Sequence, residues 1–155
     1  MDNSEFFRKN LKGKTLIVGI GNTMMGDDGA GPELIKKCRE NGVPYDTLDV
    51  GETPENYAVK ISKGDYDTIL LVDAVHMNKK PGETKILDAA YVLDTTSSTH
   101  NFSMKTYIDY LVMNTRAKVI LVGIQPKDTS FGGGLSPEIS DAIENIVKEG
   151  LLCTS

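Results

Sequence analysis

The chain has 155 residues, the length of one domain with one hydrophobic core, and we expect residues 1–155 to form a single domain. Its net charge of -5 and its lack of a basic stripe argue against a nucleic-acid partner. No apolar run approaches the roughly 20 residues of a membrane span, and the polar N-terminal segment lacks the apolar core of a secretory signal. We therefore expect a cytoplasmic protein with no membrane partner. Cys38 and Cys153 belong to no CxxC motif, which favours free thiols over a disulfide or a structural zinc site.

Strand-like and helix-like segments alternate along the chain. In chain order we predict a strand at 15–20, a helix at 32–41, a strand at 45–50, a helix capped by Thr53, strands at 68–75 and 84–87, a helix at 103–113, a strand at 118–124 and a helix at 136–152. Continuous apolar strands are buried on both faces, so the sheet should be covered by helices on each side. We predict an α/β fold, a three-layer α/β/α sandwich with a twisted, mostly parallel five-stranded sheet. The "KKPG" turn at 79–82 makes 84–87 the candidate for an antiparallel or edge strand.

A glycine-rich stretch, "GNTMMGDDGAGP" at 21–32, follows the first strand directly. Gly21 and Gly26 frame four residues, as in a phosphate-binding loop, but Asp27 and Asp28 stand where that loop needs Lys and Ser or Thr. Two carboxylates would repel phosphate. We therefore reject a P-loop.

A dinucleotide-binding fingerprint is also poorly matched. Gly19 and Gly21 begin the GxGxxG spacing, but Met24 occupies the position of the third glycine. Asp49, at the end of the second strand, could mimic the acid that binds a ribose. A nucleotide-binding module thus remains only a weak alternative, and we expect no nucleotide cofactor.

Acidic residues stand at the carboxyl ends of three predicted strands, where open α/β sheets bind their ligands. Asp28 follows the first strand, Asp49 closes the second and Asp73 closes the third. Crowded carboxylates raise one another's pKa or require a cation, so their convergence suggests a metal, a shared proton or a basic ligand. For Asp49 we favour a local role, because aspartates at strand ends often bind loop amides.

The sequence contains two histidines, and only one has a context that favours function. His100 lies in the polar stretch "DTTSSTHNFS" just before a predicted helix, where no apolar periodicity would bury it in a core. His76 lies in a loop, and we interpret it as a solvated or capping residue. Asp28, Asp73 and His100 would form an oxygen, oxygen and nitrogen site for a first-row divalent ion, without selecting one metal.

The motifs "GIGNTMMGDDGAGP", "LDVG", "LLVDA", "THN" and "LVGIQP", in this order and at these separations, resemble the hydrogenase maturation proteases. These endopeptidases trim the C-terminus of nickel-iron hydrogenase large subunits. The resemblance runs from about residue 15 to residue 152. Within the family, "MMGDDGAGP" and "GIQP" are most similar to the branch that serves formate-hydrogenlyase-type or energy-converting hydrogenases.

The resemblance implies a metal-binding and catalytic site made of Asp28, Asp73 and His100, as in an aspartyl-type endopeptidase. Asp27 is a competing ligand, because the resemblance allows Glu where this chain has the shorter Asp28, and Asp49 would have a supporting role. The implied metal is nickel, presented by the partner, a hydrogenase large-subunit precursor. Cleavage after nickel insertion would remove the C-terminal extension of that precursor.

The sequence leaves the hydrolytic mechanism open. Nickel could polarise the scissile carbonyl or activate water, or it could serve only as a recognition mark while Asp28 or Asp73 acts as the base. A different class of function is also open: a nickel chaperone that binds the precursor without cutting it.

Overall fold

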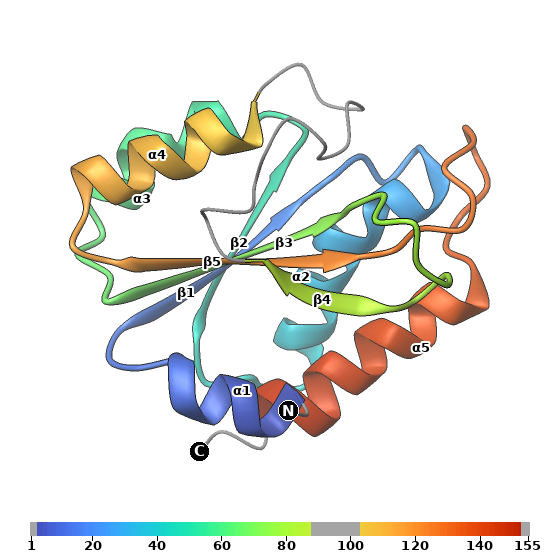
Figure 1. The fold of residues 1–155 in the computed structure, drawn as a ribbon, viewed down its shortest axis with the longest axis horizontal. Helices are drawn as coiled ribbons and strands as arrows, with labels where there is room; N and C mark the ends of the chain where they lie inside the picture. Colours follow the sequence, from blue (N-terminus) through green and yellow to red (C-terminus); the bar gives the residue numbers. More distant parts are fainter. Residues whose placement is uncertain (1–2, 88–102, 153–155) are drawn as a thin grey trace.

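One sheet of five strands forms the centre of the molecule (Figure 1). The computed structural model describes residues 3–87 and 103–152, so His100 and Cys153 lie outside the described residues. The strands are β1 (Thr15–Ile20), β2 (Asp46–Gly51), β3 (Thr68–Ala74), β4 (Thr84–Leu87) and β5 (Lys118–Ile124). Their order is β2-β1-β3-β5-β4, and every pairing is parallel except that of β4 with β5. The mostly parallel sheet and its antiparallel edge strand confirm the prediction from sequence.

Helices cover both faces of this sheet, which confirms the three-layer α/β/α architecture (Figure 1). On one face lie α1 (Asn3–Asn10), α2 (Ala30–Glu40), α5 (Pro137–Asn145) and a π-helical turn η4 (Ile146–Leu151). On the other lie the short 3-10 helix η2 (Pro54–Tyr57), α3 (Ala58–Ser62) and α4 (Met104–Asn114). A second 3-10 turn, η1 (Gly26–Gly29), joins β1 to α2.

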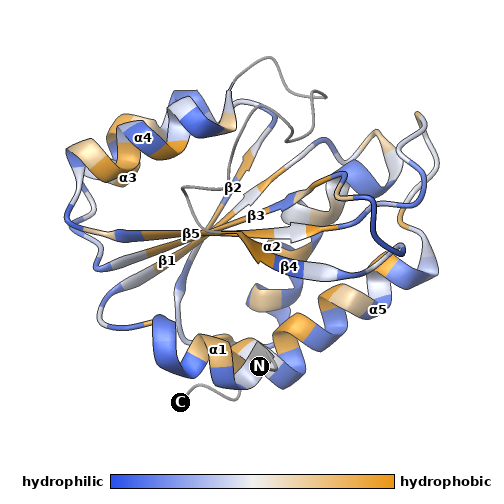
Figure 2. Cartoon of the chain, viewed as in Figure 1, coloured by the Kyte–Doolittle hydropathy of each residue, from blue (hydrophilic) through white to orange (hydrophobic). Residues whose placement is uncertain are grey.

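Alternating side chains of the strands β1, β3 and β5 enter two separate cores. In β3, Leu70 and Val72 pack with α1, α2 and α5, whereas Ile69 and Leu71 pack with α3 and α4. Figure 2 shows the apolar residues concentrated on the strands and on the inner sides of the helices. The continuous apolar strands therefore arise because both faces of the sheet are buried.

The ends of the chain differ from the prediction. Helix α1 was not predicted, yet Phe7 is fully buried in it and α1 packs against η4. The predicted final helix at 136–152 is α-helical only to Asn145 and then widens into the π-helical turn.

Thr53 occupies the N-cap position of η2, as predicted, but its side chain makes no capping hydrogen bond. Within the described ranges, every helix is too short or too polar to cross a bilayer.

Candidate active site

The order of the strands defines a crevice between β1 and β3. From β1 the chain moves to β2 on one side, and β3 then pairs with the other side of β1. Such a reversal separates the loops that follow the two strands, and ligands of open α/β sheets bind at this switch point. Asp28 lies in η1, just after β1, and Asp73 lies near the end of β3. Their exposed fractions are 3% and 2%, so the structure places two nearly buried carboxylates beside the crevice.

The glycine turn brings Asp28 back against the end of β1. Gly21 has φ +148°, and a Cβ atom there would lie 1.9 Å from the carbonyl oxygen of Asp28, so only glycine fits. A Cβ on Gly31 would lie 2.3 Å from the carbonyl oxygen of Ile20, so α2 also begins in direct contact with β1. The backbone N–H of Asn22 donates to Oδ2 of Asp28 at 3.0 Å. The glycines therefore permit a close approach of the backbone that positions an acid instead of a phosphate.

Asp27 has a different role from its neighbour Asp28. Its carboxylate is fully buried and accepts four hydrogen bonds from the loop that follows β5. The N–H groups of Lys127 and Asp128 donate to Oδ2 at 2.9 Å each, the Ser136 hydroxyl donates to Oδ2 at 2.8 Å, and the Ser136 N–H donates to Oδ1 at 2.6 Å. The backbone N–H of Asp27 also donates to the carbonyl of Asp128 at 2.9 Å. Asp27 therefore anchors the glycine turn to the β5–α5 loop.

The ionisation of Asp27 follows from these contacts. Burial alone would raise the pKa of its carboxyl group, but the hydrogen bonds from Ser136, Asp128 and Lys127 outweigh burial and lower that pKa. A carboxylate held by four donors has little remaining capacity to bind a metal. Of the two adjacent acids, Asp28 is therefore the better candidate ligand.

Asp73 projects from the sheet face that α3 and α4 cover. Side chains alternate along a strand, and Leu71, two residues earlier, belongs to the core beneath α4. Because α4 connects to the parallel strand β5, its first turn lies toward the carboxyl edge of the sheet (Figure 1). Ser103 caps this turn, and its hydroxyl accepts a hydrogen bond from the N–H of Thr106 at 3.2 Å. Ser103 is three residues beyond His100 in the chain.

The other two candidates from the sequence have local or solvent-facing positions. Asp49 is exposed, and its Oδ1 accepts from the N–H of Gly51 at 2.9 Å, which is the local role favoured from sequence. His76 is exposed in the loop after β3, also as interpreted from sequence. Across residues 3–87 and 103–152, no group of three His, Cys, Asp or Glu side chains could by itself hold a metal ion.

Two residues that the sequence analysis did not single out hold the loops around the crevice. One is Ser136, through its two bonds to Asp27. The other is Gln125, which follows β5 and is 7% exposed. Its Oε1 accepts from the N–H groups of Met77 at 2.6 Å and Lys79 at 3.3 Å, so it fixes the loop after Asp73. The position of Gln125 in "GIQP", directly after a predicted strand, was the available signal.

The chain is similar to known proteins over most of its length. The family model described as hydrogenase maturation protease matches residues 32–152. The hydrogenase 3 maturation protease of Escherichia coli strain K12 is 37% identical over 136 residues, which cover 84% of this chain and 85% of that protein. This chain belongs to the hydrogenase maturation protease family, and it is an endopeptidase.

Solved structures agree with this assignment. The crystal structure of the NiFe hydrogenase maturation protease HycI from Thermococcus kodakarensis KOD1 matches with a TM-score of 0.85 at 28% identity, covering 96% of this chain and 98% of that one. The solution structure of the endopeptidase HycI from Escherichia coli matches with a TM-score of 0.80 at 35% identity, covering 88% of each chain. The predicted family and fold class are thus confirmed.

Proposed function

We propose that this endopeptidase removes the C-terminal extension of a nickel-iron hydrogenase large-subunit precursor after nickel has been inserted. Its relatives are named as maturation proteases of hydrogenases, which supports a hydrogenase subunit as the substrate. The observation that carries the nickel dependence is the pair of carboxylates, Asp28 and Asp73, at the switch point of the sheet. Two acids withdrawn from bulk water favour the binding of a cation.

In this proposal the nickel ion belongs to the precursor and is bound by three residues of the protease. Asp28 and Asp73 supply oxygen ligands and His100 supplies nitrogen, a donor set that suits first-row divalent ions. His100 is the nitrogen donor that the sequence analysis assigned, and it precedes the Ser103 cap of α4 by three residues in the chain.

Hydrolysis of the peptide bond needs a base for the attacking water and stabilisation of the charge that develops on the carbonyl oxygen. Asp28 and Asp73 are the carboxylates positioned to act as that base. Nickel either polarises the scissile carbonyl or marks the precursor as loaded. Asp27 serves neither as the metal ligand nor as the base, because its oxygens accept hydrogen bonds from Lys127, Asp128 and Ser136.

We assign the target to the formate-hydrogenlyase-type or energy-converting hydrogenases. The motifs around the glycine turn and "GIQP" suggest this branch. The 37% identity to a hydrogenase 3 maturation protease supports a target that is related to the target of that protease. Large-subunit precursors of this type should be shortened faster than those of other hydrogenase types.

The test is to incubate the purified chain with a nickel-loaded large-subunit precursor and to follow the size of the precursor on a gel. The proposal expects one shortened product, and the Asp73→Asn variant should yield none. A complex that forms without any shortening would instead define a nickel chaperone and would overturn the proposal. Affinity for NAD or ATP would favour the nucleotide-binding alternative.

A further inference from the structure

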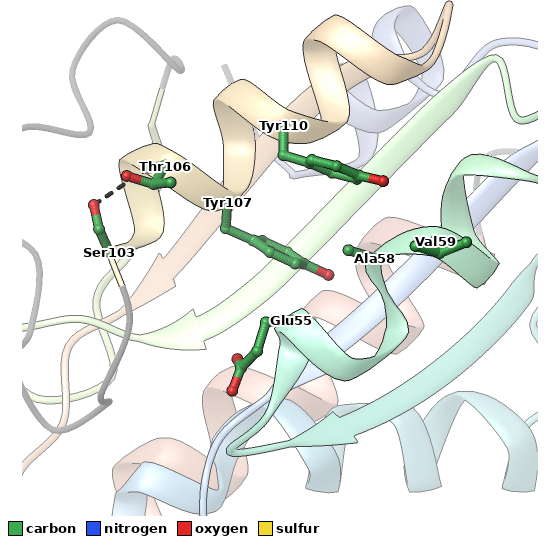
Figure 3. A pocket seen from close by; sticks show the side chains of 7 residues that line it. All are labelled: Glu55, Ala58, Val59, Ser103, Thr106, Tyr107 and Tyr110. Atoms are coloured by element: carbon green, nitrogen blue, oxygen red, sulfur yellow. Dashed lines mark hydrogen bonds between the residues drawn. The ribbon is translucent and has the colours of Figure 1, made fainter.

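A pocket lies between α3 and α4 (Figure 3). It has a volume of about 330 Å³. Its walls are Ala58 and Val59 of α3, and Thr106, Tyr107 and Tyr110 of α4. Figure 3 shows the two tyrosine rings extending from α4 towards α3. This volume is at the lower end of the range for ligand pockets, about 300–1,000 Å³, so it suits one or two side chains.

The pocket is mainly apolar, and its apolar surface is open to solvent. Val59 is 55% exposed, Tyr110 is half-buried, and Tyr107 and Ala58 form the buried part. Aromatic rings of this kind bind aliphatic or aromatic side chains through large contact areas. An exposed apolar surface with this concave shape is typical of a site that binds a partner.

Glu55, which also lines the pocket, is the one charged residue among the described residues that do so. Its side chain is exposed, and it forms no ion pair with any described residue. Glu55 therefore gives the mouth of the pocket a negative charge, which complements a cationic group beside an apolar one.

The location connects the pocket to the carboxylates of the crevice. Ser103, the cap of α4, lines one end of the pocket, and Glu55 belongs to η2, which follows the carboxyl end of β2. Both therefore lie at the edge of the sheet that carries Asp73, and on the face from which Asp73 projects. A peptide that crosses this edge to reach Asp73 passes the mouth of the pocket.

We propose that the pocket between α3 and α4 binds an apolar side chain of the precursor, with an adjacent cationic residue of the precursor paired to Glu55. This inference rests on the proposed function and specifies how the substrate is held. A protein segment fits better than a small molecule, because small-molecule sites bring several polar groups together, whereas this lining is mainly apolar and its one charged group stands at the mouth.

The test uses variants that fill the pocket or reverse its charge while the catalytic carboxylates stay intact. Val59→Trp places an indole in the pocket, and Val112→Trp is the matched control, because Val112 is 50% exposed on α4 and does not line the pocket. Glu55→Lys reverses the charge at the mouth, and Glu52→Lys is the matched control. These positions are exposed, so the variants should fold, which circular dichroism verifies.

With nickel-loaded precursor as the substrate, Val59→Trp and Glu55→Lys should raise KM by about tenfold or more and leave kcat within about twofold. This pattern is expected because the lost contact would stabilise the bound substrate and the transition state equally. The two control variants should match the wild type. An unchanged KM in both test variants, while the wild type cleaves normally, overturns this inference alone. Failure of the wild type to cleave overturns the proposed function instead.

A second measurement needs neither nickel nor cleavage. Two synthetic hexapeptides in a Gly/Ser background, one with Arg beside Leu and one with Glu beside Leu, are titrated against the wild type while the ring signals of Tyr107 and Tyr110 are followed by NMR. The Arg–Leu peptide should shift these signals at concentrations at least about tenfold lower than the Glu–Leu peptide, and Val59→Trp should abolish the difference. Equal shifts with both peptides, or no shift with either, contradict the proposed occupant.

Discussion

Asp27→Asn is the substitution that most directly tests how the glycine turn is held. An asparagine can keep its oxygen at the Oδ2 position, where it retains the donors Lys127, Asp128 and Ser136 Oγ, but its NH₂ group then faces the N–H of Ser136. Hydrogen bonds to a charged acceptor contribute about 1 kcal/mol more than those to a neutral one, and a buried donor left without an acceptor costs about 1–3 kcal/mol. Three such bonds and one unpaired donor give an expected loss of roughly 4–6 kcal/mol in the free energy of unfolding.

Urea denaturation followed by circular dichroism measures this loss. The control is Asp128→Asn, because Asp128 is exposed and, among the described residues, its side chain bonds only within its own turn, to Ser130. Its midpoint should change little. A midpoint for Asp27→Asn equal to that of the wild type would refute the reasoning that this carboxylate joins the two loops.

The pH dependence of the same loss follows from the lowered pKa of Asp27. A carboxyl group with a pKa lower in the folded than in the unfolded state stabilises the fold above its unfolded pKa, about 3.9, and loses that contribution as the pH falls through the folded value. The difference in free energy of unfolding between the wild type and Asp27→Asn should thus be constant from pH 7 to pH 5 and should shrink below about pH 4. A difference that grows as the pH falls through this range would contradict the assigned ionisation.

Four further predictions concern the site. Asp73→Asn should abolish processing with the fold retained, and normal processing by the folded variant would remove Asp73 from the site. His100→Ala should lose nickel-dependent cleavage and should weaken the binding of cadmium, used as a surrogate for nickel. In the wild type, cadmium binding should weaken from pH 7.5 to pH 5.5, because protons compete for an imidazole whose unperturbed pKa is about 6.5. His76→Ala should change neither cleavage nor binding, and the reverse outcome would show that His100 is not the nitrogen ligand. Gly21→Ala should destabilise the fold by more than about 1 kcal/mol through its contact with the glycine turn, whereas Gly42→Ala, with φ +65° and open space around its Cβ, controls for backbone strain alone. The isolated chain should purify without metal, and a chelator-resistant zinc ion in each chain would contradict this.

The sheet could be predicted because its signal is local. The apolar runs at β1, β3 and β5 are continuous. The turn "KKPG" before β4 predicts a reversal of chain direction, so β4 could be predicted as the antiparallel edge strand. Helix α1 gives no such signal. It has only eight residues, and the surface that buries Phe7 includes η4, at the opposite end of the sequence.

The division of roles between Asp27 and Asp28 could not be predicted for a similar reason. The two residues are identical and adjacent, and the sequence motif gives no means of separating them. The separation comes from Lys127, Asp128 and Ser136, which are at least 100 residues away in the chain and are brought to Asp27 by the position of β5 in the sheet. The assignment of His100, by contrast, stays a prediction from sequence.

The most direct test of the central claim, that nickel in the precursor permits cleavage at the Asp28–Asp73 edge, is the intact mass of the large subunit after incubation with the wild-type chain. Two precursor samples are compared, one loaded with nickel and one prepared without it. The account predicts that the loaded sample alone loses the mass of its C-terminal extension. Equal shortening of the two samples would contradict the claim that nickel controls the reaction.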